Sequence, residues 1–451
     1  MNHILIKNAT IINEGKRFIG NVLIEDAFIK KIAAPDEPLL SLPDQTQIIE
    51  ADYKLLLPGV IDDQVHFRQP GLTHKGDLSS ESRAAVAGGV TSVMDMPNTI
   101  PQTITQDLLN EKYRMGAADC LCNYSFFIGA TNNNLNELLK TDLDNVCGIK
   151  VFMGSSTGNM MVDDPDSLEQ LFKRSKILIA THCEDENIIK HNLKLCKDKY
   201  GDLIPFWEHP NIRNAEACFQ STSLAVGLAR KYNSRLHVLH LSSSKEMDLF
   251  DNHIELKKKR ITAEVCVPHL WFSDKDYERL GSKIKWNPAI KTLADQQKLW
   301  EALLDGRLDI IATDHAPHTK EEKNNPYLKA PSGGPMIQHS LVLMLECAAK
   351  GLISIEKVVG KMCHAPAEVF NIEKRGYLRE GYYADMTLVE EKKWTVTPQS
   401  LLYRCGWSPL EGQEFGSQVA QTFVNGNLVY DNGMIIDNHK GMRLRFHRNE
   451  E

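Results

Sequence analysis

Short apolar runs and longer amphipathic stretches alternate along the middle of the chain. The apolar runs are typical of buried strands and lie at residues 55–61, 90–96, 124–130, 148–153, 177–183, 235–241, 261–267 and 308–313. Stretches with a helical spacing of apolar residues lie between most of them, at 103–115, 133–140, 166–174 and 213–232. Buried strands that alternate with helices in this way predict an α/β fold, a (β/α)8 TIM-type barrel. A doubly wound open sheet has the same alternation and remains the alternative.

The two ends of the chain have a different pattern. Residues 1–57 and 376–451 contain short apolar stretches separated by Asn, Gly, Pro and Asp, which is typical of strands joined by turns. In the second stretch, Asn425 and Gly426 predict the turn of a β-hairpin. We therefore expect a small β-sandwich domain built from both termini, 1–57 and 376–451, beside a barrel domain of residues 58–375.

The composition is that of a globular protein with a full core, because 42% of the 451 residues are hydrophobic and 25% are charged. The formal net charge is −7, which argues against nucleic acid or an anionic membrane surface as the main partner. No apolar run approaches the roughly 20 residues of a transmembrane helix, and no signal peptide is visible. The ten cysteines have no framework spacing, so we expect reduced thiols and a cytoplasmic protein.

Possible metal ligands follow the predicted strands repeatedly. In a barrel enzyme, functional side chains gather at the carboxyl ends of the strands. The ends of strands one, four, five, six and eight carry His66, Lys150, His182, His240 and Asp314. One histidine at a strand end would more often be structural, but this combination supplies the imidazole and carboxylate ligands that Zn²⁺ accepts. The sequence therefore predicts a metal site at one mouth of the barrel.

Lys150 has the apolar neighbours Ile149, Val151 and Phe152, so burial of its charged ammonium group would be costly. It could instead extend to solvent or pair with a carboxylate. The sharper hypothesis is that burial and a nearby metal lower its pKa, so that the neutral amine takes up carbon dioxide. The resulting carbamate would be an anionic ligand with two oxygens, able to bridge two metal ions.

Five short segments carry a resemblance to a known family. They are Pro58-Gly59-Val60-Ile61-Asp62, Val65-His66-Phe67-Arg68-Gln69-Pro70-Gly71, Met96-Pro97-Asn98-Thr99-Ile100-Pro101, Lys285-Trp286-Asn287-Pro288-Ala289 and Asp314-His315-Ala316-Pro317-His318. Their order resembles that of the amidohydrolase superfamily over nearly the whole chain. The last segment is similar to a motif of the cyclic amidohydrolases, and Arg68 together with Asn98 narrows the resemblance to the dihydroorotases of the longer, class I type.

The resemblance implies one or two Zn²⁺ ions at the mouth of the barrel. His66 and Asp314 would hold one ion, His182 and His240 the other, and a carbamate on Lys150 would bridge them. A metal-bound hydroxide would attack the ring amide, with Asp314 as general base and then general acid. The expected reaction is the reversible hydrolysis of (S)-dihydroorotate to N-carbamoyl-L-aspartate in pyrimidine (UMP) biosynthesis.

The resemblance also implies which residues bind this small-molecule substrate. Arg68, Asn98 and His318 would bind its carboxylate, because a guanidinium group can form paired hydrogen bonds with a carboxylate. The contacts implied for the ring amide groups come from Asn287 and from the backbone near Ser332 and Gly333. Barrel enzymes of this superfamily are often dimers, which adds a homodimer to the expected partners.

Position 64 departs from the family pattern. The superfamily's first strand carries His-x-His, whereas this chain has Gln64 two residues before His66. Because side chains alternate along a strand, Gln64 and His66 should face the barrel interior, Asp63 should point the other way, and His237 should face away from the mouth. A neutral amide oxygen is a weaker zinc ligand than imidazole. Either the first metal site is weak or catalysis is lost; we expect a working enzyme, because the other ligands are present.

Two other functions remain open. Allantoinases and dihydropyrimidinases are the nearest enzymatic alternatives, although Arg68 and Asn98 favour a substrate that carries a carboxylate. A non-catalytic scaffold, a dihydroorotase-like partner of aspartate transcarbamoylase, is the alternative from a different class. Gln64 is the feature that favours the scaffold.

Overall fold

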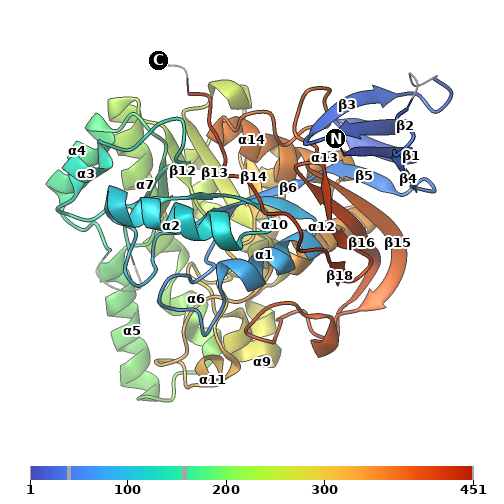
Figure 1. Ribbon diagram of the computed structural model, residues 1–451. Coiled ribbons are helices and arrows are strands. Elements are labelled where there is room, and N and C mark those ends of the chain that lie inside the picture. The colour runs from blue at the N-terminus through green and yellow to red at the C-terminus, as the bar shows by residue number, and fades with distance from the viewer. Residues whose placement is uncertain (1, 38–41, 155–159, 449–451) are drawn as a thin grey trace.

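The computed structural model describes residues 2–37, 42–154 and 160–448. The middle of the chain forms two parallel sheets, one of order β6-β7-β8 and one running from β9 to β14 (Figure 1). Their strands are β6 (Val60–Val65), β7 (Val90–Asp95), β8 (Asn123–Phe126), β9 (Ile128–Gly129), β10 (Ile149–Phe152), β11 (Ile179–His182), β12 (Leu236–Val238), β13 (Ile261–Cys266) and β14 (Ile310–Ala312).

The two parallel sheets join at both edges. At one edge the chain passes from β8 to β9 across a single residue. At the other, the backbone N–H of His66 donates to the carbonyl oxygen of His315 at 2.7 Å, beside a bridge between Val65 and His315. The strands therefore close into the predicted barrel, and the alternative of an open doubly wound sheet is wrong.

Helices cover the outside of the barrel between the strands (Figure 1). The longer ones are α1 (Leu78–Ala87), α2 (Gln106–Asp119), α4 (Pro165–Arg174), α5 (Glu186–Tyr200), α7 (Ala215–Tyr232), α10 (Leu293–Asp305) and α12 (Ser340–Ala349). The short ones are α3 (Leu135–Leu138), α6 (His209–Ile212), α8 (Val267–Trp271), α9 (Tyr277–Leu280), α11 (Lys320–Lys323), α13 (Ile355–Val359) and α14 (Ala365–Phe370). In α4, Asp164 caps the first turn, Pro165 opens it and Arg174 lies in the last, as helix-end preferences favour.

In the part of the chain that the structure describes, strands from both ends share one nine-stranded sheet, which lies beside the barrel (Figure 1). Its order is β18-β17-β16-β15-β5-β1-β2-β3, with β4 paired to β1. The strands are β1 (His3–Asn13), β2 (Lys16–Glu25), β3 (Phe28–Ala33), β4 (Gln47–Glu50), β5 (Leu55–Pro58), β15 (Met386–Thr395), β16 (Glu414–Val424), β17 (Asn427–Asp431) and β18 (Met434–Ile435). A sheet shared by the two ends agrees with the expected small β domain, while the numbered domain boundaries stay predictions.

The hairpin expected near the C-terminal end is present. Asn425 and Gly426 connect β16 to β17, and both have positive φ angles, 50° and 75°. Gly426 also leaves no room for a side chain, because a Cβ atom there would lie 1.9 Å from the carbonyl oxygen of Asp26. The turn therefore needs glycine both for its backbone angle and for its close contact with the N-terminal strands.

The strand predicted at 55–61 is two strands in two different sheets. β5 ends at Pro58 and pairs with β1 and β15, whereas β6 begins at Val60 and pairs with β7. Gly59 separates them, and a Cβ atom on it would lie 2.1 Å from the side chain of Thr91. An unbroken apolar run hides this change of sheet, because both strands are buried.

Strand β6 contains an irregularity that reverses one expectation. Its register against β7 shifts between Asp62 and Val65, so side chains no longer alternate there. Asp63 points into the barrel, where it contacts His237 of β12 and Glu264 of β13. Neither strand is a neighbour of β6 in the sheet, so the contact crosses the interior. The expectation that Asp63 points the other way is wrong.

The described cysteines are buried and free of disulfides, in agreement with the expected thiols. Within the described ranges, no helix is both long enough and apolar enough to pass through a membrane.

Candidate metal and substrate site

A pocket of about 240 Å³ opens at the carboxyl ends of the barrel strands, and we call it the mouth pocket. Every site residue expected from the sequence lines it. These residues are Gln64, His66, Arg68, Asn98, Lys150, His182, His240, Asn287, Asp314, His318, Ser332 and Gly333. The structure therefore brings the whole set together, and the role of each residue stays a prediction.

Three residues of the mouth pocket other than glycine have a left-handed backbone conformation. The φ angles of Arg68, His240 and Asp314 are 69°, 41° and 46°, and each residue lies just beyond the end of a barrel strand. This conformation is costly for residues with a side chain and is concentrated at functional sites. Here the residues with this conformation are those that carry a guanidinium, an imidazole and a carboxylate at one mouth of the barrel.

The expected metal ligands form two pairs. His66 Nε2 lies 3.2 Å from Asp314 Oδ1, and His182 Nδ1 lies 3.0 Å from His240 Nε2. In the described part of the chain, neither pair belongs to a group of three His, Cys, Asp or Glu donor atoms within 4.8 Å of one another. Each pair therefore needs a further ligand, such as a carbamate on a neighbouring lysine, to complete a metal site.

The imidazoles of the three histidines expected to be metal ligands are suited to metal binding. Burial lowers the pKa of His66, His182 and His240, which keeps the rings neutral and able to act as ligands. The buried Nδ1 atom of His240 has no hydrogen-bond partner among the described residues. Neutral imidazoles and the Asp314 carboxylate form a donor set that fits a divalent metal ion.

Lys150 lies on β10 with 1% of its surface exposed. Burial lowers the pKa of its amine to about 7, against the opposing attraction of Asp314 and Glu264. Its Nζ atom lies 4.6 Å from the centre of the Phe152 ring. A large fraction of this amine is therefore neutral near pH 7, as carbamate formation requires.

Glu184 holds the His182 ring in place, and sequence reasoning missed it. Its Oε2 atom lies 3.0 Å from His182 Nε2 and also accepts a hydrogen bond from Arg213. Burial alone would raise the pKa of Glu184, but Arg213 and His182 outweigh burial and lower it to about 2. The carboxylate therefore fixes a proton on His182 Nε2 and leaves Nδ1 free to act as a ligand. The available signal was the position of Glu184, two residues after His182.

Gln64 turns its amide nitrogen toward the mouth pocket. Nε2 donates to Asp314 Oδ1 at 3.3 Å, while Oε1 accepts from the Cys266 thiol at 3.5 Å. An NH₂ group cannot act as a metal ligand, so in this orientation Gln64 positions the Asp314 carboxylate instead.

Arg68 also lines the mouth pocket, with 5% of its surface exposed. Its Nε donates to the carbonyl oxygen of Pro317, and its Nη2 lies 3.0 Å from His318 Nε2. Burial lowers the pKa of Arg68 to about 10, and burial and Arg68 together lower the pKa of His318. Within the described ranges, Arg68 has no ion pair with a carboxylate of the chain. A buried guanidinium without such a partner favours an anionic ligand.

The other groups expected to contact the substrate differ in whether their hydrogen-bonding atoms already have partners within the chain. The Oδ1 atom of Asn98 lies 2.8 Å from His66 Nδ1, and Oδ1 of Asn287 is buried without a partner among the described residues. The carbonyl oxygen of Ser332 accepts from His318, and the N–H of Gly333 donates to the carbonyl oxygen of Lys285. Asn287 is therefore the side chain of this group with the clearest unused hydrogen-bonding capacity.

Comparisons with known proteins agree with the geometry of the mouth pocket. The model of the amidohydrolase family matches residues 55–429. A dihydroorotase of Halobacterium salinarum is 33% identical, with 88% of this chain and 90% of that protein covered. A dihydroorotase of Pyrococcus abyssi is 30% identical, with 95% and 96% covered. Among solved structures, the L-hydantoinase (dihydropyrimidinase) from Arthrobacter aurescens has a TM-score of 0.90 at 25% identity and covers 97% of this chain and 98% of its own.

Proposed function

Because the chain belongs to the amidohydrolase family and matches dihydroorotases over nearly its whole length, we propose that it is a dihydroorotase. It hydrolyses a cyclic amide C–N bond, converting (S)-dihydroorotate to N-carbamoyl-L-aspartate in a reversible reaction. The observation that carries the choice of substrate is the buried guanidinium of Arg68, which has no carboxylate partner in the described part of the chain and lies on the same pocket as the metal-binding residues.

His66 and Asp314 would hold one divalent metal, His182 and His240 would hold a second, and a carbamate on Lys150 would complete both sites. A metal bound there lowers the pKa of a bound water and polarises an amide carbonyl. We infer Zn²⁺, since imidazole and carboxylate donors are ligands of that ion. With Gln64 donating to Asp314, the site of His66 and Asp314 would be the weaker of the two.

The residues of the chain supply binding and proton transfer. Arg68 would form paired hydrogen bonds with the substrate carboxylate, with Asn98 and His318 beside it. Asp314 would accept a proton from the attacking water at its carboxylate and return it to the ring nitrogen as the C–N bond breaks. The short contacts of Asp314 with Gln64 and His66 support this role, because they hold the carboxylate in one orientation.

The expected partner is a small molecule, as it is for an enzyme of this family. The cytoplasmic location and the homodimer stay predictions, and so does the carbamate on Lys150. Asn287 would contact the ring amide groups, in keeping with its buried Oδ1 atom, which has no partner among the described residues. The backbone near Ser332 and Gly333 would contact these groups as well.

A second candidate is the hydrolysis of an uncharged ring amide, which the likeness to the Arthrobacter aurescens hydantoinase (dihydropyrimidinase) favours. Turnover of dihydroorotate, dihydrouracil and allantoin by the purified, zinc-loaded protein separates the two. We expect dihydroorotate to be the preferred substrate and Arg68→Met to reduce this preference. Preferred turnover of dihydrouracil or allantoin would favour the second candidate. If a folded, metal-loaded protein turned over none of the three compounds, the non-catalytic scaffold would be the remaining function.

A further inference from the structure

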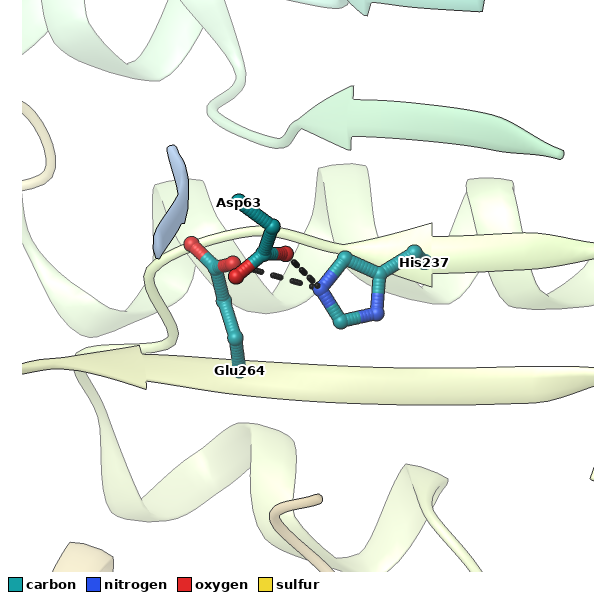
Figure 2. A group of neighbouring side chains, drawn as sticks. All are labelled: Asp63, His237 and Glu264. Atoms are coloured by element: carbon teal, nitrogen blue, oxygen red, sulfur yellow. Dashed lines mark hydrogen bonds and ion pairs between the residues drawn. The ribbon is translucent and has the colours of Figure 1, made fainter. Parts of the chain in front are cut away.

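A second group of charged side chains lies inside the barrel, away from the mouth pocket. It consists of Asp63 on β6, His237 on β12 and Glu264 on β13, and we call it the lower cluster (Figure 2). All three side chains are fully buried, and none lines the mouth pocket. The expected site residues do not include them.

The two carboxylates of the lower cluster converge on one nitrogen. Asp63 Oδ2 and Glu264 Oε2 each lie 3.2 Å from His237 Nε2, and Figure 2 shows both approaching that atom. A charge-assisted N–H···O hydrogen bond is shorter, about 2.7–2.9 Å. Two ligands bound to Zn²⁺ at about 2.1 Å with tetrahedral angles are about 3.4 Å apart. Both distances in the lower cluster lie at the long end of the range for N–H···O hydrogen bonds and near the spacing of metal ligands.

The other nitrogen of His237 is arranged as in a metal-bound histidine. Nδ1 lies 2.8 Å from the hydroxyl oxygen of Thr262, and this hydroxyl lies 3.3 Å from the carbonyl oxygen of Leu236. A carbonyl only accepts, so the Thr262 hydroxyl donates to Leu236 and accepts from Nδ1–H. The Nε2 atom can then present its lone pair to a cation, with Thr262 as the outer partner that holds the ring.

The two carboxylates of the lower cluster need compensating positive charge, from protons or from a metal ion. Neither oxygen of Asp63 accepts a hydrogen bond from a described residue, although Oδ2 approaches His237. Two ionised carboxylates carry two negative charges. A proton on His237 would offset one of these charges, whereas a divalent cation would offset both. The Phe370 ring packs against His237 with ring centres 5.6 Å apart, so the cluster has an apolar neighbour. An uncompensated charge in such a place would be strongly unfavourable.

We propose that Asp63, His237 and Glu264 bind a divalent metal ion, best matched by Zn²⁺, at a buried structural site separate from the mouth pocket. The metal would hold together strands one, six and seven of the barrel. It would also support the mouth, because Glu264 Oε1 accepts the backbone N–H of His240 at 3.0 Å. The proposal does not depend on the reaction assigned to the mouth pocket.

The deciding experiment is a crystal structure of the wild-type protein grown with Zn²⁺, with anomalous data on both sides of the zinc absorption edge. We expect an anomalous peak between His237 Nε2, Asp63 Oδ2 and Glu264 Oε2 that is resolved from any peak in the mouth pocket. The proposal is overturned if the three side chains are well ordered and no peak lies between them. Protons would then neutralise the cluster, since the carboxylate contacts outweigh burial and raise the pKa of His237 to about 9.

Metal content in solution gives an independent test. After dialysis against a chelator and reloading with Zn²⁺, Asp63→Asn should bind one equivalent less per chain than the wild type. Glu246→Gln is the matched control, because Glu246 is also a buried carboxylate but is held by hydrogen bonds from Thr222 and Ser243. Equal zinc content in Asp63→Asn and the wild type would contradict the proposal. If Asp63→Asn does not fold, the anomalous map of the wild type decides.

Discussion

The mouth pocket and the lower cluster are both built from buried ionisable side chains, yet different groups lack a partner in the two regions. In the mouth pocket, the guanidinium of Arg68 and the amine of Lys150 have no ion pair with a carboxylate of the described chain. In the lower cluster, two carboxylates share a single histidine. The first region therefore offers a place for a substrate carboxylate beside Arg68 as well as for the proposed metal ions, whereas the second is suited to a cation alone. The polar groups that a folded chain leaves unbalanced indicate what it binds.

The largest effect is expected at Lys150. Lys150→Ala removes the amine on which the carbamate would form, so neither metal pair gains its third ligand. We expect dihydroorotate turnover to fall by about 10³-fold or more, because several kcal/mol of charge stabilisation are lost. Steady-state kinetics with added Zn²⁺ and bicarbonate measure this loss. The control is the melting temperature of the metal-free proteins, which should not fall, since a buried amine that has no ion pair in the described chain is removed. Retention of more than about a tenth of the activity would show that Lys150 is dispensable.

A substitution beneath the lower cluster should act on stability instead. Phe370 is fully buried and packs on His237 and Phe127. Phe370→Ala should lower the free energy of unfolding by about 3–5 kcal/mol through loss of apolar contact and formation of a cavity. Chemical denaturation measures this change. For comparison, dihydroorotate turnover per folded molecule is measured for the same variant. A loss of turnover as large as that expected for Lys150→Ala would mean that the lower cluster and the mouth pocket do not act independently.

Arg68 tests whether the mouth pocket selects for a carboxylate. Arg68→Lys keeps the positive charge but removes the planar pair of donors that matches a carboxylate. We expect kcat/KM for dihydroorotate to fall about 30- to 100-fold, equivalent to about 2–3 kcal/mol, mainly through a higher KM. The matched measurement is hydrolysis of dihydrouracil, which lacks the carboxylate and should change little. An equal fall for both substrates would place Arg68 in structural support rather than in recognition.

The smallest effect concerns pH. The pKa of Lys150 is about 7 in the folded protein, below its ordinary value of 10.5. Above pH 7 the unfolded chain therefore binds more protons at this residue than the folded chain, and stability should rise with pH. Between pH 7 and 8.5, Lys150→Met should remove about 1–2 kcal/mol of that rise. Denaturant titrations of both proteins, free of metal and bicarbonate, at the two pH values measure the difference, and parallel curves would show that the Lys150 pKa is not lowered.

The alternation of apolar runs was sufficient to predict the barrel and the strand ends that carry chemistry. A side chain that follows a buried parallel strand reaches the mouth whatever the details of the loops, so His66, Lys150, His182, His240 and Asp314 could be placed together from sequence. This regularity is local, however, and it fails where the backbone is irregular.

Asp63 was misplaced for that reason. Strict alternation directs it out of the barrel, but the register shift in β6 directs it inward, and no residue type in the segment marks that shift. Glu184 was missed for a different reason. Its partner Arg213 lies 29 residues later in the chain, and only the folded structure shows that the two meet behind His182.

The sheet shared by both ends of the chain has a consequence for synthesis on the ribosome. Leu55 of β5 pairs with Val389 of β15, so one edge of the N-terminal strands stays without its partner until most of the barrel has been translated. Unpaired strand edges invite association between nascent chains. Elongation speed over the barrel region and chaperone access to β5 during that interval therefore bear on the yield of native protein. A fusion partner placed after β18 would be translated after β15 and would not prolong the interval in which β5 is unpaired.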